Sequence, residues 1–125
     1  MADQRHLVLI VDDDQAVRDS LEFALRLEGL CVHVHSGAAA LLADPDLNRA
    51  SCVVVNDRIP PADSFELLGR LQASHAGLSS ILLTSHATPR IQARADAAGV
   101  SKVLEKPLLG STLIDSIRTI LNANP

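Results

Sequence analysis

Short runs of aliphatic, largely β-branched residues alternate along this chain with longer segments whose apolar residues recur at helical spacing. The short runs, which we interpret as strands, cover residues 7–11, 31–35, 52–55, 81–83 and 103–104. The helical segments cover residues 16–28, 37–47, 64–74, 89–98 and 111–122. Alternation of this kind predicts a parallel sheet with helices on both faces. We therefore predict an α/β fold, a doubly wound (βα)5 sheet, as a single domain over residues 1–125.

Residues that commonly start and stop helices flank several of these segments. Gly29 follows the helix 16–28, in the place where a glycine often ends a helix. Thr88 followed by Pro89 has the pattern of an N-cap with proline at the first helical position. Ser36 is expected to cap the second helix.

Composition narrows the functions that this domain can have. Hydrophobic residues make up 47% of the chain but aromatic residues only 2%, so the core is expected to be aliphatic and no set of rings can stack nucleic-acid bases. The formal net charge is −4 and no basic stripe is visible, so direct binding to DNA or RNA is not expected. No signal peptide or membrane span is recognisable, and a cytoplasmic location is expected. Cys31 and Cys52 are expected to be buried free thiols.

Two histidines in the second predicted strand indicate where that strand lies. His33 and His35 stand two residues apart, so both side chains point to the same face. This pattern favours a strand at the edge of the sheet with solvated histidines, and a metal-binding His-x-His pair is the alternative. The strand order 2-1-3-4-5 places this strand at an edge.

Polar residues follow the four other predicted strands. They are Asp12, Asp13 and Asp14, then Asn56 and Asp57, then Thr84 and Ser85, then Glu105 and Lys106. Open parallel sheets bind ligands beyond the carboxyl ends of their strands, near the point where the strand order reverses. Adjacent carboxylates attract a hard cation such as Mg²⁺, and a hydroxyl and an ammonium group can hold phosphoryl oxygens. The joint placement indicates a site for a cation and a phosphoryl group.

Four segments resemble the receiver domain of two-component response regulators, and the likeness extends over nearly the whole chain. The segments are the acidic motif 9–14, the phosphorylation segment 53–60, the threonine motif 81–85 and the lysine motif 104–107. The resemblance implies a flavodoxin-like receiver fold and a cis peptide before Pro107. It implies metal binding by Asp12, Asp13, residue 56 and the backbone carbonyl of Arg58, and phosphoryl binding or switching by Thr84, Lys106 and residue 103.

The chain departs from the family pattern at the residue that accepts the phosphoryl group. In the family an aspartate stands four residues before a proline, and counting back from Pro60 gives Asn56. A neutral amide is no nucleophile toward phosphorus. Loss of one negative charge is also expected to weaken Mg²⁺ binding, by roughly 1 to 4 kcal/mol. Asp57 is expected to point to the other face, pairing with Arg58 or capping a backbone N–H, because side chains alternate along a strand.

Two further departures point in the same direction. Val103 stands where the family usually has a switching Tyr or Phe, and Ser64 stands where it usually has glycine. An aliphatic valine cannot swing a ring between two positions, so the usual coupling of Thr84 to the helix 89–98 is not expected. The remaining site residues can still hold Lys106 against the carboxylates of Asp12 and Asp13 when no phosphoryl group is bound.

We therefore predict a degenerate receiver that is not an enzyme and that serves as an interaction module in two-component signalling and transcription regulation. An ordinary phospho-accepting receiver in which asparagine has replaced the acceptor stays open. A small Mg²⁺-dependent phosphohydrolase with Asp12 as nucleophile is the alternative from another class. That class needs an acidic pair after the lysine, and only Asp115 follows Lys106. A flavodoxin-like cofactor binder would need a phosphate-cradling first loop, which this sequence lacks.

The expected partners are a sensor histidine kinase and an output domain or protein. The face formed by the helix 89–98, the strand 103–104 and the helix 111–122 is expected to mediate partner docking or a homodimer, because adjacent loop leucines need a cover. The residues predicted for this face are Arg90, Arg94, Leu108, Leu109, Ile114 and Arg118.

Overall fold

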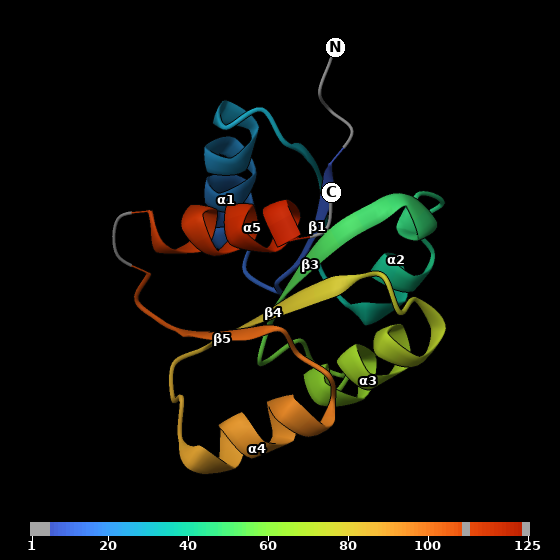
Figure 1. The fold of residues 1–125 in the computed structure, drawn as a ribbon, viewed down its shortest axis with the longest axis vertical. Coiled ribbons are helices and arrows are strands. Elements are labelled where there is room, and N and C mark those ends of the chain that lie inside the picture. The colour runs from blue at the N-terminus through green and yellow to red at the C-terminus, as the bar shows by residue number, and fades with distance from the viewer. Residues whose placement is uncertain (1–5, 109–110, 124–125) are drawn as a thin grey trace.

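A five-stranded parallel sheet lies between two layers of helices in the structure, a computed structural model that describes residues 6–108 and 111–123 (Figure 1). The strands are β1 (Leu7–Val11), β2 (Cys31–His35), β3 (Ala50–Asn56), β4 (Ser79–Thr84) and β5 (Lys102–Glu105). Their order is β2-β1-β3-β4-β5, so the predicted fold class and strand order are confirmed. The central strands β1 and β3 bring the acidic motif and the phosphorylation segment side by side.

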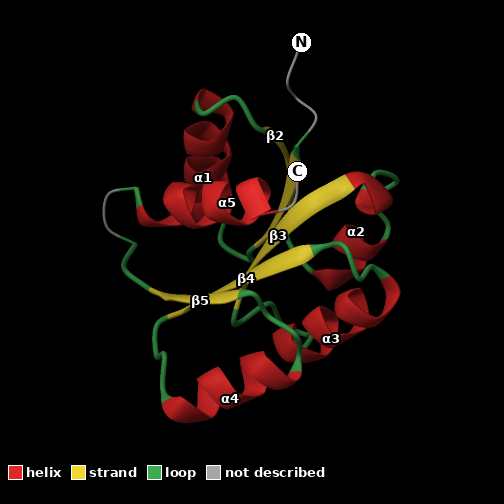
Figure 2. Ribbon diagram, in the orientation of Figure 1, coloured by secondary structure: helices red, strands yellow, loops and turns green. Residues whose placement is uncertain are grey.

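The helices divide between the two faces of the sheet, as Figure 2 shows. They are α1 (Gln15–Leu27), α2 (Ala38–Leu42), α3 (Ser64–Ser74), α4 (Pro89–Ala97) and α5 (Thr112–Ala123). Alternate residues of β1 serve the two layers: Leu7, Leu9 and Val11 belong to the core beneath α2, α3 and α4. Val8 and Ile10 belong to the core beneath α1 and α5. Burial of both faces explains why the central strands read as continuous aliphatic runs.

Helix boundaries follow the capping chemistry of the sequence at α1 and α4. Asp14 caps α1, and its carboxylate accepts from the backbone N–H groups of the first turn. Gly29 follows the end of this helix with a φ of 84°, a left-handed conformation that glycine adopts without the strain of a Cβ atom. Thr88 caps α4 with Pro89 at the first helical position, as predicted. No helix within the described residues is long and apolar enough to cross a bilayer.

The second helix is much shorter than predicted. It ends at Leu42, not at residue 47, and a separate 3-10 segment, η1, covers Leu47–Arg49. Pro45 explains the early end, because a proline disfavours helical backbone at the residue before it. The predicted capping role of Ser36 is also wrong: Gly37 occupies the N-cap and makes no side-chain cap bond.

Strands β3 and β4 begin earlier than the aliphatic runs that predicted them. Ser79 pairs with Cys52 and Ser80 with Val53 in the β3–β4 ladder. Polar residues at the start of a strand interrupt the apolar pattern but not the backbone pairing, so sequence periodicity placed these starts too late.

The two cysteines are free thiols with different surroundings. Cys52 is fully buried in β3, whereas Cys31 at the start of β2 is only partly buried. Burial raises the pKa of the Cys52 thiol to about 12, because a thiolate loses its hydration in an apolar core. Cys52 is therefore a core residue of low reactivity.

Candidate functional site

The carboxyl ends of β1, β3, β4 and β5 bring the predicted polar residues together at one edge of the sheet. Asp12 follows β1 and Asn56 ends β3, while Thr84 ends β4 and Lys106 follows β5. Asp12, Asn56 and Thr84 are all buried. Because parallel strands point the same way, these residues meet although they are far apart in the sequence.

Asn56 is the centre of this site and is bonded on both sides of its amide. Its Oδ1 accepts from Lys106 Nζ at 2.6 Å, and its Nδ2 donates to the backbone carbonyl of Arg58 at 2.9 Å. The peptide bond between Lys106 and Pro107 is cis, as the resemblance implied. Lys106 thus contacts the neutral amide of Asn56, whereas contacts with carboxylates were predicted from the sequence.

Ser64 forms a hydrogen bond to the backbone of Asn56, a contact that was not predicted from the sequence. Ser64 is 2% exposed, and its hydroxyl donates to the backbone carbonyl of Asn56 at 2.6 Å. A glycine at this position would have no such donor. The serine thus holds the backbone at the end of β3, next to the side chain that contacts Lys106.

The prediction for Asp57 is wrong. Within the described part of the chain, its carboxylate neither pairs with Arg58 nor caps a backbone N–H; its Oδ2 accepts from the Thr84 hydroxyl at 2.7 Å. The strand ends at Asn56, so the alternation of side chains no longer decides where the next residue points. Thr84 is itself completely buried, and its Oγ1 also accepts from the His86 backbone N–H at 3.1 Å. The threonine hydroxyl is therefore committed to a carboxylate within the chain.

The three aspartates after β1 have three different environments. Asp12 is 3% exposed, and its Oδ1 accepts from the Asp14 backbone N–H at 2.9 Å. Asp13 is exposed, and Asp14 caps α1. Burial raises the pKa of the Asp12 carboxyl; the Asp14 N–H and the positive charge of Lys106 oppose this, while the negative charges of Asp13 and Asp14 add to it. Asp12 is thus a carboxylate held in an environment that disfavours its charge.

Replacing Asp12 with asparagine is expected to stabilise the metal-free protein at neutral pH. A raised pKa means that the fold favours the protonated form of Asp12. The protonated carboxyl stabilises the fold at acidic pH, and this contribution is lost as pH rises through the raised pKa. Asparagine keeps an acceptor for the Asp14 N–H. Urea unfolding should show a higher midpoint for Asp12→Asn, with the gain shrinking at acidic pH, and a smaller gain for Asp13→Asn, because Asp13 is exposed and acts on Asp12 only through its charge. A lower midpoint for Asp12→Asn would show that the carboxylate contacts outweigh its burial.

The oxygens predicted to bind Mg²⁺ are only partly free to do so. Asp12 and Asp13 carry carboxylates of the kind that Mg²⁺ prefers. The Oδ1 of Asn56 is already bonded to an ammonium group, and the carbonyl of Arg58 accepts from the Asn56 amide. A cation at this site would share both oxygens with these hydrogen bonds and would lie close to the charge of Lys106.

The residues predicted for the partner face do not all lie free on one surface. Arg94 turns toward α3: it pairs with Asp63 at 3.4 Å, and its guanidinium lies 4.1 Å from the centre of the Phe65 ring. Arg118 turns toward the end of α1 and pairs with Glu28 at 2.7 Å.

The remaining residues of that face have mixed exposure. Arg90 is exposed, and Leu108 and Ile114 are partly buried against the core beneath α1 and α5. Leu109 lies outside the described residues. The existence of a docking face here stays a prediction.

Comparison with known proteins agrees with this geometry. A family model described as the response regulator receiver domain matches residues 8–118. The chain is 38% identical over 115 residues to the transcriptional regulatory protein FixJ of Azorhizobium caulinodans, covering 91% of this chain and 54% of that protein. It is 37% identical over 125 residues to the C4-dicarboxylate transport transcriptional regulatory protein DctD of Pseudomonas aeruginosa, covering 95% of this chain and 26% of that protein. The chain thus spans about half the length of these curated relatives, or less.

Solved structures give the same answer for the fold. A receiver domain protein of the CheY-like type from Methanospirillum hungatei superposes with a TM-score of 0.88 at 26% identity, over 94% of each chain. The non-phosphorylated HemR receiver domain of Leptospira biflexa superposes with a TM-score of 0.80 at 25% identity, over 92% of this chain and 94% of the other. Fold, strand-end residues and family match agree: the chain belongs to the receiver domains of two-component response regulators.

Proposed function

We propose that this receiver domain is not switched by aspartyl phosphorylation and acts in signalling as a protein-interaction module. The observation that carries the proposal is the contact between Lys106 Nζ and Asn56 Oδ1 at 2.6 Å. Asn56 occupies the position at which the family resemblance places the acceptor aspartate. An amide there cannot attack phosphorus, and it already accepts a hydrogen bond from the lysine that the resemblance assigns to phosphoryl binding.

The hydrogen bonds around the site support a single resting state. Thr84 donates to Asp57 and Lys106 donates to Asn56, so both groups that the resemblance assigns to phosphoryl binding have partners inside the chain. A ligand can shift a conformational equilibrium only by as much as it binds the two states differently. We infer that any change in the conformation of this domain is driven by a binding partner that prefers one conformation, and not by a phosphoryl group.

We further propose that Mg²⁺ binds weakly and that the domain is not an enzyme. Asp12 and Asp13 would hold the cation with one negative charge fewer than an aspartate at position 56 would give. For the phosphohydrolase alternative, the acidic residue that follows Lys106 is Asp115. It lies on α5 and accepts from the Ser111 hydroxyl at 2.8 Å, so it does not supply the acidic pair that such an enzyme needs.

The partners we propose are a sensor histidine kinase and an output domain or protein that regulates transcription. The FixJ and DctD relatives are named as transcriptional regulatory proteins, and each is longer than this chain. Contact through α4, β5 and α5, including a homodimer, is part of the same proposal. Among the described residues it rests on the exposed Arg90 and on the partly buried Leu108 and Ile114.

Incubation with acetyl phosphate and Mg²⁺, followed by intact-mass measurement, tests the proposal. We expect the mass to stay that of the unmodified chain, and beryllofluoride added to a sample that already contains Mg²⁺ to leave the NMR spectrum unchanged. A stable gain of one phosphoryl group would contradict the proposal. Asp57 is the carboxylate beside Thr84, so loss of that gain in Asp57→Asn would identify it as the acceptor.

A further inference from the structure

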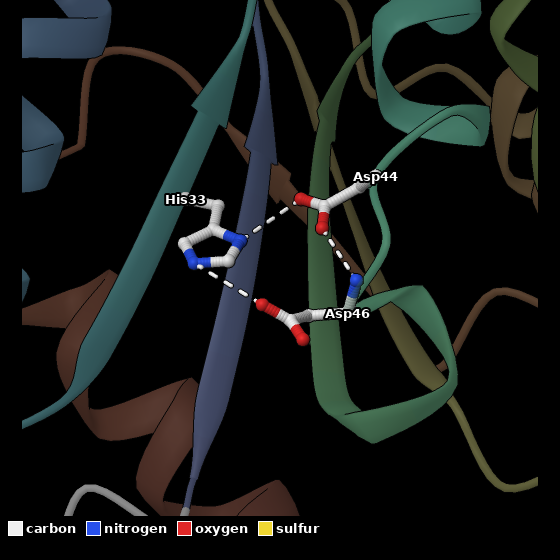
Figure 3. Close-up of side chains that lie close together, drawn as sticks. All are labelled: His33, Asp44 and Asp46. Atoms are coloured by element: carbon white, nitrogen blue, oxygen red, sulfur yellow. Dashed lines mark hydrogen bonds and ion pairs between the residues drawn. The ribbon is translucent and has the colours of Figure 1, made fainter.

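Two imidazoles and two carboxylates converge at the β2 edge of the sheet, outside the site described above. His33 and His35 project from β2, and Asp44 and Asp46 come from the turn between α2 and η1. Figure 3 shows His33 between the two carboxylates, with one ring nitrogen facing each. Ligand atoms of His33, Asp44 and Asp46 all lie within 4.8 Å of one another.

One oxygen atom is the focus of the cluster. Asp44 Oδ2 lies 2.9 Å from His33 Nδ1 and 2.8 Å from His35 Nε2. The other oxygen of Asp44 accepts from the Asp46 backbone N–H at 2.8 Å. The Asp44 side chain is only 3% exposed, so its orientation is fixed by bonds on both oxygens. Solvated histidines were predicted for this edge strand, but both rings contact the buried Asp44 carboxylate.

We propose that this cluster binds a divalent transition-metal cation of the Zn²⁺ class, with His33, Asp44 and Asp46 as its protein ligands. Imidazole nitrogen and carboxylate oxygen are ligands of Zn²⁺ at about 2.0 to 2.2 Å. At tetrahedral angles those bond lengths separate two ligand atoms by about 3.3 Å. The 2.9 Å between His33 Nδ1 and Asp44 Oδ2 needs to open by only a few tenths of an ångström, and the Asp46 carboxylate, in the same 4.8 Å group of ligand atoms, needs to come closer.

Asp46 supplies the third ligand. Its Oδ2 lies 3.9 Å from His33 Nε2, and its carboxylate belongs to the group of ligand atoms within 4.8 Å of one another. His35 lies outside that group. Its Nε2 is 2.8 Å from Asp44 Oδ2, so it orients a ligating carboxylate, as outer partners of metal sites do. The two carboxylates balance the charge of a divalent cation.

The cluster has access to solvent for a fourth ligand. A surface cavity of about 620 Å³ is lined by both histidines and Asp44. Glu22 and Arg26 line the same cavity but are paired with each other at 2.8 Å. A water molecule can therefore complete the coordination from the cavity side, as in zinc sites with three protein ligands.

Titration of the untagged protein with Zn²⁺ against a chromophoric chelator tests the proposal, with Mg²⁺ in excess to occupy the acidic site at Asp12. We expect one Zn²⁺ per chain and a higher unfolding temperature in its presence. The ligand variants His33→Gln, Asp44→Asn and Asp46→Asn should abolish saturable binding. His35→Gln should weaken it by at least about tenfold, as for an outer partner of a metal ligand.

The matched control is His86→Gln, which removes an exposed histidine and should bind Zn²⁺ as the parent chain does. Glutamine retains a side-chain N–H that can donate to Asp44, and far-UV circular dichroism checks the fold of each variant. NMR of the parent chain gives an independent readout, because Zn²⁺ should shift the ring signals of His33 and His35 and leave that of His86 unchanged. The proposal is overturned by absence of saturable binding in the parent chain, or by unchanged binding in the His33→Gln/His35→Gln double variant.

Discussion

Replacing Asn56 with aspartate is expected to convert a domain that acetyl phosphate leaves unmodified into one that takes up a phosphoryl group in the presence of Mg²⁺. The new carboxylate would stand within reach of Lys106, which now lies 2.6 Å from the amide oxygen. An oxygen of that carboxylate attacks phosphorus while the bond from phosphorus to the acetyl oxygen breaks, and acetate leaves. Intact-mass measurement should show a gain of one phosphoryl group per chain, which should disappear when Mg²⁺ is chelated.

The same substitution should strengthen Mg²⁺ binding and weaken the metal-free fold. A charge at about 4 Å from the cation contributes roughly 1 to 4 kcal/mol, which corresponds to at least about a fivefold gain in affinity. Without the cation, the carboxylate would face the Arg58 carbonyl that now accepts from the amide and would lie near the buried Asp12. Isothermal titration with Mg²⁺ and urea unfolding with and without it measure the two effects.

A matched control makes the same change of charge elsewhere. Asn48 is exposed in η1, and Asn48→Asp should leave the mass of the protein unchanged by acetyl phosphate. A double variant, Asn56→Asp with Asp57→Asn, should still be phosphorylated. If the folded Asn56→Asp protein stays unmodified with Mg²⁺ present, residue 56 is not at the acceptor position and our interpretation of the site is wrong.

Removal of the Asp44 carboxylate should cause a large loss of stability at neutral pH, measured without metal. In Asp44→Ala, the two rings and the Asp46 N–H all lose their acceptor. A buried donor without a partner costs about 1 to 3 kcal/mol. His33 is 32% exposed on its side chain, so water can replace part of its bond. We expect the free energy of unfolding to fall by roughly 3 kcal/mol, seen as a lower urea midpoint in the presence of a chelator.

The pH dependence of this effect has a defined sign. Burial alone would raise the pKa of Asp44, but the Asp46 backbone N–H and the two histidine bonds outweigh it and lower the pKa from 3.8 to about 2. A lowered carboxyl pKa stabilises the fold above the unfolded value of 3.8 and ceases to do so as pH falls toward 2. The shift corresponds to about 2 kcal/mol. The unfolding free energies of the parent chain and Asp44→Ala should therefore converge over this acidic range.

Asp96→Ala is the control for this series, because Asp96 is exposed on α4. Exposed substitutions of this kind change stability by less than about 0.5 kcal/mol. A gap between the parent chain and Asp44→Ala that stays constant from neutral pH to pH 2 would show that its carboxylate charge does not stabilise the fold.

Sequence periodicity was sufficient for the architecture but not for the second helix. Five aliphatic runs and their alternation with helical segments predicted the sheet, and the histidine pattern placed β2 at its edge, as found. The apolar pattern continued past Leu42, yet the helix ends there. Pro45 and the bonds of Asp44 to β2 decided the end, and such a contact across the fold leaves no periodic signal in the sequence.

For the polar site at the carboxyl edge of the sheet, the sequence again predicted only part of what the structure shows. Spacing from Pro60 placed asparagine at the acceptor position, because that count depends only on residues four apart in the sequence. The partners of the site did not follow from spacing: Asp57 reaches Thr84, and the Ser64 hydroxyl holds the Asn56 carbonyl. Where β3 ends, the backbone leaves the pleat, and local conformation then sets the direction of each side chain.

The sequence by itself determined which residues line the carboxyl edge of the sheet and that the central one is a neutral amide. Only the tertiary structure decided how they pair: Lys106 with Asn56, 50 residues away, and Thr84 with Asp57, 27 residues away. The same holds for the two imidazoles that share one oxygen of Asp44. The physical reason is that residue type and periodicity are local properties of the chain, whereas a hydrogen bond between distant residues depends on positions that strand pairing and loop conformation fix together.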